Sequence, residues 1–328
     1  MDIAILGAGA WGSALAAALS AHHRVALWTR SAAQRTHIAA TRRSAYLPGI
    51  ELPAGVTVTD VMAEAARGRE LVIAATPTAG LRDALAALAA HASPVPLLWA
   101  CKGFELDTSR LPHEVVAETL PGWREVGAFS GPSFAIEVAR GLPAALTVAS
   151  RDEGFARRAA AALHHAPLRI YSSVDVTGVE LGGALKNIMA IAAGISDGLG
   201  LGANARAALV TRGLAEMARL GVRMGGEPDT FMGLTGLGDL VLTATGDLSR
   251  NRTVGMRIAS GMPVQRILAE LGHVAEGVSS ARAARELARR HGVDMPITQA
   301  VCAVLFEGLA PTTAVEALLS RDTRPEIA

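Results

Sequence analysis

A lysine within an apolar stretch has the clearest potential for acid–base chemistry in this sequence. Lys186 and its neighbour Asn187 lie in segment 179–194, which is otherwise apolar and contains glycine. Such a lysine either extends its amine to the surface or is held in a site. Burial, or a second cation nearby, would lower the pKa of the amine toward ~7–8, where a general base works at neutral pH. We therefore take Lys186 as the candidate catalytic residue.

Two further charged residues could complete such a site. Lys102 follows the apolar run 96–100, at the carboxyl end of an expected strand, where open α/β sheets bind ligands. It is either a solvated loop lysine or the second cation that lowers the pKa of Lys186. Asp239 lies among apolar residues and glycines, where it either caps or ion-pairs locally, or faces the lysine site. Thr243, one helical turn later, would share the face of Asp239.

Two short motifs could bind an anionic substrate. Ser249, Arg250 and Asn251 offer a hydroxyl, a guanidinium and an amide, a set suited to a phosphate monoester; a surface turn is the alternative. Gly131 and Ser133 follow an expected strand and could present backbone N–H groups and a hydroxyl to the substrate. Ser133 could equally be the N-cap of a helix over 134–140.

A glycine motif indicates dinucleotide binding. Gly7, Gly9 and Gly12, with Ala10 and Trp11 between them, follow the first expected strand and open the first expected helix. In this context the glycines permit a tight turn, close approach of a pyrophosphate and close packing of helix on strand. The free N–H groups of the helix would then face the phosphates.

The end of the second strand bears on the choice of nucleotide. NAD-specific folds place an acid there for the ribose hydroxyls, whereas this chain has Arg30, with Arg35 nearby. Arg30 could pair with a 2′-phosphate, or it could be an ordinary surface arginine. The sequence favours NADP(H) and leaves NAD(H) open. Metal is not expected, because the histidine pairs 22–23 and 164–165 lack metal-binding spacing.

The elements that must position these residues form two regions. Up to about residue 174, short apolar runs alternate with alanine-rich helical patterns, which predicts a doubly wound, mostly parallel sheet of the Rossmann type. From residue 179 onward the periodicity is helical throughout. We expect a dinucleotide-binding domain over residues 1–177 and an all-helical substrate-binding and catalytic domain over 178–328. The expected strands cover 2–6, 24–28, 71–75, 96–100, 126–130, 145–149 and 169–171; the principal expected helices cover 12–21, 61–67, 78–91, 114–120, 153–164, 204–224, 276–290, 297–306 and 313–319.

Composition excludes several other classes. The 328 residues are 50% hydrophobic and 19% charged, with a net charge of +1, so neither disorder nor a nucleic-acid partner is expected. Two cysteines fit a reducing cytoplasm and no disulfide framework. No membrane span is expected, and the apolar N-terminus has glycines at fixed spacing instead of a basic signal-peptide start.

The chain resembles the bacterial NAD(P)-dependent glycerol-3-phosphate dehydrogenases over nearly its whole length. The matching segments occur in order, and their joint occurrence is far more specific than any one of them. They are 7–15 (GAGAWGSAL), 99–103 (WACKG), 130–135 (SGPSFA), 180–187 (ELGGALKN), 236–242 (GLGDLVL) and 249–251 (SRN). The chain departs from the family pattern at two positions. It has Ala244 where many relatives have cysteine, and Arg30 where some have histidine.

The resemblance implies roles for these residues. Lys186 would remove the C2 hydroxyl proton of glycerol 3-phosphate as hydride leaves to the nicotinamide, with Lys102 and Asp239 completing the catalytic set. The substrate-binding residues implied are Lys102, Gly131, Ser133, Lys186, Asn187, Asp239, Thr243, Ser249, Arg250 and Asn251. Those implied for the cofactor are Gly7, Gly9, Ala10, Trp11, Gly12, Arg30, Lys102, Ala135, Arg250, Val274 and Glu276.

Two other functions stay open on the sequence alone. One is a different two-domain hydroxyacid dehydrogenase, in which Arg250 would bind a carboxylate. The other is a non-catalytic NADPH-sensing protein, for which Lys186 would be dispensable. The expected partner is a small phosphorylated substrate, glycerol 3-phosphate or dihydroxyacetone phosphate, and a second copy in a homodimer is a further candidate. The resemblance implies that the reaction supplies glycerol phosphate for phospholipid synthesis.

Overall fold

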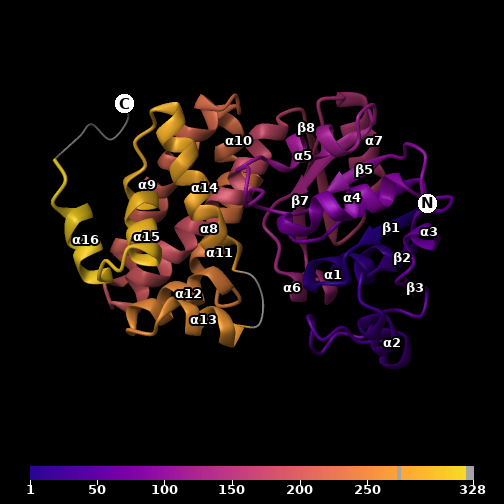
Figure 1. Ribbon diagram of the computed structural model, residues 1–328, viewed down its shortest axis with the longest axis horizontal. Coiled ribbons are helices and arrows are strands. Elements are labelled where there is room, and N and C mark those ends of the chain that lie inside the picture. Colours follow the sequence, from indigo (N-terminus) through magenta and orange to yellow (C-terminus); the bar gives the residue numbers. More distant parts are fainter. Residues whose placement is uncertain (272–274, 323–328) are drawn as a thin grey trace.

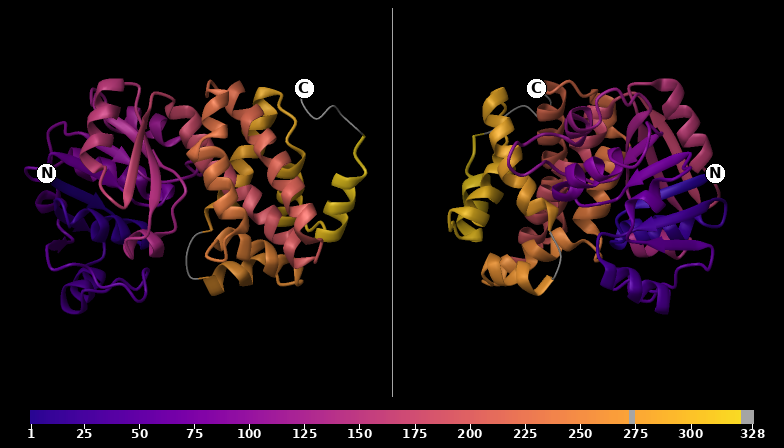
Figure 2. Two further views of the ribbon diagram at one scale, coloured as in Figure 1. Left: turned by 180° about the vertical axis from the view of Figure 1, so that it is seen from behind. Right: turned by 45° about the vertical axis from the view of Figure 1, so that its right-hand side comes forward.

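The chain forms an α/β lobe followed by a helical lobe, as expected from the sequence (Figure 1). This computed structural model describes residues 1–271 and 275–322. Figure 2 shows the two lobes side by side from two further directions, with the sheet confined to the N-terminal one.

The α/β lobe is built on a single sheet. Its order is β3-β2-β1-β4-β5-β6-β7-β8, parallel throughout except for the antiparallel β6–β7 pair. Every residue of β4 and nearly all of β1 is buried, because helices cover both faces of the sheet. The strands are β1 (Asp2–Leu6), β2 (Arg24–Trp28), β3 (Val56–Thr59), β4 (Leu71–Ala74), β5 (Leu97–Trp99), β6 (Val126–Ser130), β7 (Ala144–Ala149) and β8 (Leu168–Ser173). The predicted mostly parallel, doubly wound sheet is confirmed.

The strand order reverses at β1, which pairs with β2 on one side and β4 on the other. In open α/β sheets, ligands bind in the crevice outside the carboxyl ends of the strands at such a reversal. The glycine turn after β1 therefore lies where a dinucleotide is expected.

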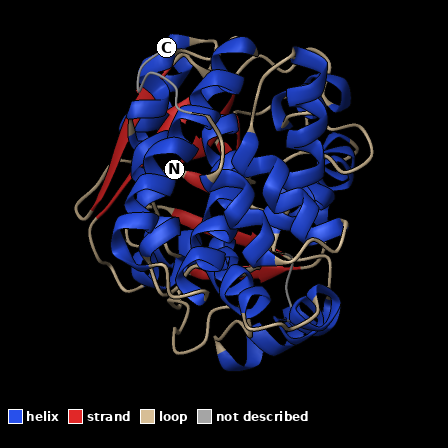
Figure 3. Cartoon of the chain, turned by 90° about the vertical axis from the view of Figure 1, so that its left-hand side faces the viewer, coloured by secondary structure: helices blue, strands red, loops and turns tan. Residues whose placement is uncertain are grey.

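Helices flank this sheet, and Figure 3, seen from the side of the helical lobe, shows its strands behind helices. They are α1 (Ala10–Leu19), α2 (Ala32–Thr41), α3 (Met62–Ala66), α4 (Leu81–Ala89), α5 (Pro112–Thr119), α6 (Ala135–Ala139) and α7 (Glu153–Leu163), with a 3-10 turn η1 (Thr78–Gly80) before α4. The sequence did not predict α2, in which only Ile38 is buried, or the short edge strand β3. The single helix predicted over 78–91 is in fact η1 followed by α4.

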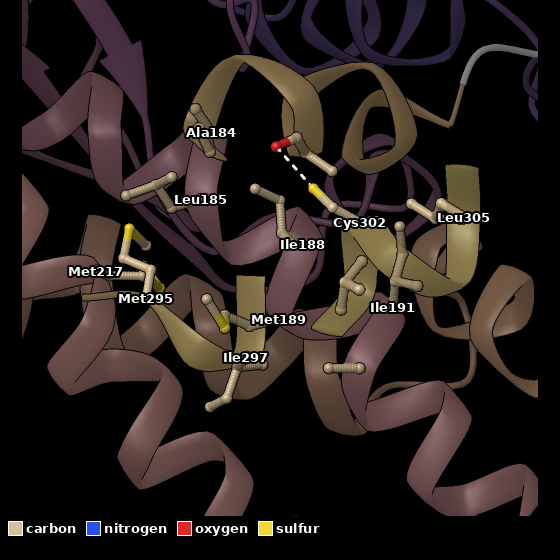
Figure 4. Close-up of a cluster of buried hydrophobic side chains, with 14 of the residues drawn as sticks. Ala184, Leu185, Ile188, Met189, Ile191, Met217, Met295, Ile297, Cys302 and Leu305 are labelled. Carbon is tan, nitrogen blue, oxygen red and sulfur yellow. Dashed lines mark hydrogen bonds between the residues drawn. The ribbon is translucent and has the colours of Figure 1, made fainter. Parts of the chain in front are cut away.

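The helical lobe is arranged around one long helix, α8 (Val176–Gly198). The others are α9 (Gly202–Arg223), α10 (Pro228–Met232), α11 (Asp239–Thr245), α12 (Arg250–Ala259), α13 (Val264–Leu271), α14 (Glu276–His291), α15 (Pro296–Phe306) and α16 (Pro311–Leu319), with a π-helical turn η2 (Leu234–Gly238) before α11. Figure 4 shows Leu185, Ile188 and Met189 of α8 packed among side chains of the neighbouring helices. By length and composition α8 could cross a membrane, but its whole apolar window is buried inside the chain, as in a core helix.

Two glycines bring α12 against the backbone of α8. A Cβ on Gly194 would lie 2.0 Å from the carbonyl oxygen of Arg252, and one on Gly255 would lie 2.1 Å from that of Ile191. Only glycine allows so close a crossing. The start of α12, with the motif 249–251, is thereby held beside the middle of α8.

No separate linker joins the lobes, because only two residues lie between the end of β8 and the start of α8. Val176 and Val179, in its first turn, belong to a core cluster of the α/β lobe, whereas Leu181 and later apolar residues belong to that of the helical lobe. We propose residue 177 as the domain boundary, inside this first turn.

Candidate active site

The glycine turn has the geometry that the motif predicts. Gly7 adopts φ +113°, and its N–H donates to the carbonyl oxygen of Trp28 at 2.9 Å. A Cβ on Gly12 would lie 1.9 Å from the carbonyl oxygen of Gly7, so α1 can pack here only with glycine. A Cβ on Gly9 would meet nothing within 4 Å, so the space in front of the turn is open. Ala10 and Trp11 form the first turn of α1, whose N–H groups face this opening.

Two lysines from different lobes meet on one buried carboxylate. Lys186 Nζ donates to Asp239 Oδ1 at 2.5 Å, and Lys102 Nζ donates to Asp239 Oδ2 at 2.8 Å. Asp239 is fully buried, and the side chains of Lys186 and Lys102 are only 8% and 15% exposed. Lys186 Nζ also donates to Thr243 Oγ1 at 3.0 Å, and Lys102 Nζ to the carbonyl oxygen of Gly131 at 2.9 Å. The structure thus brings together the residues that sequence reasoning assigned to acid–base chemistry.

The surroundings of Lys186 lower its pKa from 10.5 to about 8. Burial is the main cause, because it disfavours the charged amine. Asp239 opposes burial by favouring the ammonium form, while the positive charge of Lys102 acts with burial. Lys102 is therefore close enough to act as the predicted second cation that lowers the pKa of Lys186.

Asp239 is positioned by an unusual turn. It is the first residue of α11 and follows η2, in which the N–H of Gly238 donates to the carbonyl oxygen of Gly233, five residues earlier, at 3.1 Å. The turn packs against α8 at Gly182, where a Cβ would lie 2.5 Å from the carbonyl oxygen of Thr235. Such π-helical turns are rare in proteins, and many of those that occur lie at functional sites.

Asn187 of α8 and Asn251 of α12 are hydrogen-bonded to each other. Asn251 Nδ2 donates to Asn187 Oδ1 at 2.9 Å, and the N–H of Gly277 donates to Asn251 Oδ1 at 3.1 Å. Both asparagines are buried. The pair links α8, α12 and the first turn of α14 beside Lys186.

Arg250 and Ser249 start α12. Ser249 is its N-cap, since its hydroxyl accepts a hydrogen bond from the N–H of Arg252 at 3.2 Å. Arg250 is exposed at the helix N-terminus. Its charge, with those of Lys102 and Lys186, acts to lower the pKa of Glu276, but burial outweighs them and raises it. These charges therefore surround one region of the interface between the lobes.

The motif after β6 differs in part from expectation. Gly131 adopts φ +141°, and a Cβ there would lie 2.9 Å from the carbonyl oxygen of Ala145, so glycine is required. Ser133 is not the N-cap of the following helix. That position is Phe134, and Ser133 Oγ instead donates to the carbonyl oxygen of Gly131 at 3.1 Å. Helix α6, which begins at Ala135, packs against α1 next to the glycine turn.

Arg30 is exposed at the end of β2, and no hydrogen bond or ion pair of its side chain occurs within residues 1–271 and 275–322. Arg35, which could have helped it, forms an ion pair with Asp60 at 3.3 Å. Of the two residues expected to reach the cofactor from the helical lobe, Glu276 begins α14, and Val274 lies outside the described residues.

Sequence reasoning missed several polar groups near this interface. Among residues 1–271 and 275–322, the buried hydroxyls of Thr76, Ser130 and Ser280 have no hydrogen-bond partner. Ser130 lies beside Gly183 of α8, near the stem of Lys102. The position of Ser130 at the carboxyl end of an expected strand could have marked it as a candidate site residue. In the part of the chain that the structure describes, no group of three or more His, Cys, Asp or Glu residues is arranged to hold a metal ion.

Comparison with known proteins identifies the family. Residues 2–156 match the N-terminal family model, and residues 175–316 the C-terminal family model, of NAD-dependent glycerol-3-phosphate dehydrogenase. The chain belongs to this dehydrogenase family. Its relatives are NAD(P)-dependent oxidoreductases.

Individual members of the family match over almost the whole chain. A glycerol-3-phosphate dehydrogenase (NAD(P)+) from Thiobacillus denitrificans is 57% identical over 327 residues, covering 99% of this chain and 100% of the relative. One from Ralstonia nicotianae is also 57% identical and covers 99% of both chains. The crystal structure of glycerol-3-phosphate dehydrogenase from Coxiella burnetii superimposes with a TM-score of 0.92 at 39% identity, covering 98% of this chain and 99% of that one. The family resemblance inferred from the sequence is confirmed.

Proposed function

We propose that this chain interconverts sn-glycerol 3-phosphate and dihydroxyacetone phosphate with NAD(P), with Lys186 as the acid–base residue. Membership of the dehydrogenase family supports the reaction. The observation that carries the role of Lys186 is its buried amine, bound to Asp239 Oδ1 at 2.5 Å beside a second lysine. A group with pKa about 8 can take up or release a proton near neutral pH.

The turn after β1 suits a dinucleotide. Gly12 keeps α1 close to the turn and Gly9 leaves the space in front of it open. In this proposal Gly7, Gly9, Ala10, Trp11 and Gly12 hold the pyrophosphate at the N-terminus of α1. The nicotinamide of such a dinucleotide would supply the hydride acceptor or donor.

Lys186 would transfer the proton of the C2 hydroxyl group, and the side chains around it would hold its amine in place. In the oxidation direction, the neutral amine of Lys186 accepts the proton of the C2 hydroxyl oxygen. In the reduction direction, its ammonium form donates a proton to the oxygen that develops negative charge. Asp239 and Thr243 hold the amine in place through the bonds described above. Lys102 offers a positive charge to the same oxygen and opposes protonation of Lys186.

The phosphate of the substrate would lie at the start of α12. A helix N-terminus attracts anions, and Arg250 adds a guanidinium that matches phosphate oxygens in pairs. Asn187, Ser249 and Asn251 shape this region, with Lys102, Gly131 and Ser133 on the opposite lobe. Ala135 and Glu276 would contact the cofactor from α6 and α14.

The role of Lys186 is tested by Lys186→Ala. We expect turnover of dihydroxyacetone phosphate to fall by at least ~10²-fold, the usual loss for an acid–base residue, with NADPH affinity largely retained. Unphosphorylated 2-oxoacids should be poor substrates of the unmodified enzyme. Undiminished turnover in Lys186→Ala would exclude this mechanism, and good turnover of 2-oxoacids would favour a hydroxyacid dehydrogenase.

We further propose that NADPH is preferred over NADH, because Arg30 replaces the acid that NAD-specific folds carry at this point. The guanidinium of Arg30 is exposed and has no partner among the described residues, so it could meet a 2′-phosphate. Arg30→Asp should lower kcat/KM for NADPH by ~10-fold or more and leave NADH turnover unchanged or improved. Arg43→Asp, a change of the same charge at another exposed arginine of this lobe, is the control. Equal effects of the two variants would refute the assignment.

Three broader expectations complete the proposal. The reaction would supply glycerol phosphate for phospholipid synthesis in the cytoplasm. The two domains would divide the work at residue 177, with cofactor bound by residues 1–177 and substrate chiefly by 178–328. The oligomeric state, including a homodimer, is tested by light scattering.

A further inference from the structure

A buried carboxylate outside the proposed site connects the two lobes. Glu180 lies in the second turn of α8, and its side chain is 2% exposed. Its Oε1 accepts hydrogen bonds from Trp99 Nε1 at 2.7 Å and from the backbone N–H of His113 at 2.8 Å. Its Oε2 lies 2.5 Å from His113 Nδ1. All three partner groups belong to the α/β lobe.

These contacts satisfy groups that would otherwise be costly to bury. Trp99 is 2% exposed, so its indole N–H needs a partner inside the protein. His113 is the second residue of α5, and its backbone N–H is one of those that a helix N-terminus leaves unpaired. Burial acts to lower the pKa of His113, but the hydrogen bond and charge of Glu180 outweigh it and raise that pKa. A single carboxylate thus fixes the end of β5 and the start of α5 to α8.

The same face of α8 leads to the proposed site. Glu180, Gly183 and Asn187 recur at helical spacing along one stripe. At Gly183 this stripe passes the stem of Lys102, where an added Cβ would lie 3.4 Å from Lys102 Cγ. Lys102 comes three residues after Trp99, and Lys186 comes six residues after Glu180. The contact between Glu180 and Trp99 therefore holds the segment that carries Lys102 against the helix that carries Lys186.

We propose that Glu180, with Trp99 and His113, is a positioning clamp that sets the distance between Lys102 and Lys186. Without it, α8 could shift against β5, and the lysines could no longer meet Asp239 from opposite sides. Glu180 acts through the lysines and need not touch substrate or cofactor. This inference rests on the proposed role of Lys186.

Two substitutions of Glu180 separate geometry from charge. Glu180→Ala removes all three contacts, and we expect kcat to fall by ~10–100-fold, the usual effect of a displacement of about 1 Å at a reacting centre. The affinity for NADPH, which the glycine turn determines, should change by less than about threefold. Glu180→Gln can keep every contact if its amide donates to a neutral His113, so it should retain kcat within about threefold.

The control is a second buried carboxylate that lies outside the proposed site. Glu216 of α9 accepts hydrogen bonds from the backbone N–H groups of Ile297 and Thr298 at the start of α15. Glu216→Ala should lower the melting temperature as Glu180→Ala does but leave kcat unchanged. The pH–rate profile gives a second readout. Glu180→Ala should move its midpoint away from that of the unmodified enzyme, because the burial of Lys186 and its distances to Asp239 and Lys102, all of which affect its pKa, change together. Glu216→Ala should not move it.

If Glu180→Ala does not fold, Trp99→Phe removes one hydrogen bond of the clamp and should lower kcat several-fold. Equal kcat and equal midpoints in the Glu180 and Glu216 variants would overturn the clamp, as would a loss in Glu180→Gln as large as in Glu180→Ala. These outcomes leave the role of Lys186 intact if Lys186→Ala is inactive. An active Lys186→Ala would instead refute the proposed function.

Discussion

Raising the pH from 7 to 9 should change the two directions of the proposed reaction in opposite senses. Oxidation of glycerol 3-phosphate needs the neutral amine of Lys186, and reduction of dihydroxyacetone phosphate needs its ammonium form. Because the pKa of Lys186 is about 8, both forms are substantially populated within this range. The shift from 10.5 corresponds to a destabilisation of the ammonium form by about 3 kcal/mol relative to a lysine in water, with burial as its largest cause.

The expected magnitude follows from this pKa. Roughly one lysine in ten is neutral at pH 7 and roughly nine in ten at pH 9. Oxidation should therefore rise about tenfold between these values and level off, while reduction falls about tenfold. An unperturbed lysine would give a different result. Oxidation would rise about a hundredfold without levelling, and reduction would stay nearly constant.

The assay is kcat/KM for the substrate against pH in both directions at saturating cofactor, which reports the ionisations of the enzyme–cofactor complex before the substrate binds. The second ionisation of the substrate phosphate, near pH ~6, lies below this window. Replacing Lys102 by Met removes the cation that opposes protonation of Lys186, so the midpoint should move upward. Profiles of the same sign in both directions, or no change up to pH 9, would show that Lys186 is not the titrating group.

Three further predictions concern the glycine turn after β1 and the contact of Glu216 with the start of α15. In Gly12→Ala the new Cβ would overlap the carbonyl oxygen of Gly7, so we expect a loss of ~1–3 kcal/mol in the free energy of unfolding and at least tenfold weaker NADPH binding. Gly9→Ala meets no neighbour and should keep the melting temperature while weakening NADPH binding; normal binding in both variants would contradict the pyrophosphate site. Glu216→Ala leaves two buried N–H groups at the start of α15 unpaired, and urea denaturation should show a loss of roughly 2–3 kcal/mol. A loss below about 0.5 kcal/mol would mean that water replaces the carboxylate.

Local patterns accounted for the parts of the molecule that short segments determine. The glycine motif predicted the turn after β1, and the apolar surroundings of Lys186 predicted its burial, since both depend on neighbours along the chain. Helix α2 and strand β3 were not predicted, because they lie at the sheet edge with few buried apolar residues. The N-cap role that the sequence offered for Ser133 as an alternative was wrong, because its actual partner, the carbonyl oxygen of Gly131, depends on the fold around β6.

Contacts between distant segments could not be predicted from one sequence. Asn187 and Asn251 are 64 residues apart, and nothing in either segment indicates that their amides meet. Glu180 belongs to a recognised family segment, but its partners Trp99 and His113 lie 81 and 67 residues away. The shared use of Asp239 by two lysines likewise became evident only from the structure.

The π-helical turn before Asp239 has a consequence for how the length of this segment can vary. A π turn holds one residue more than an α turn between bonded groups, so deleting one residue within 234–238 would let the segment continue as an ordinary α-helix. Asp239 and the later side chains of α11 would then keep nearly their present direction, because the wide turn absorbs the one residue that would otherwise rotate them by about 100° around the helix axis. A one-residue deletion within η2 should therefore leave the carboxylate facing both amines, whereas a one-residue deletion inside α11 between Asp239 and Thr243 would turn the Thr243 hydroxyl about 100° away from Lys186.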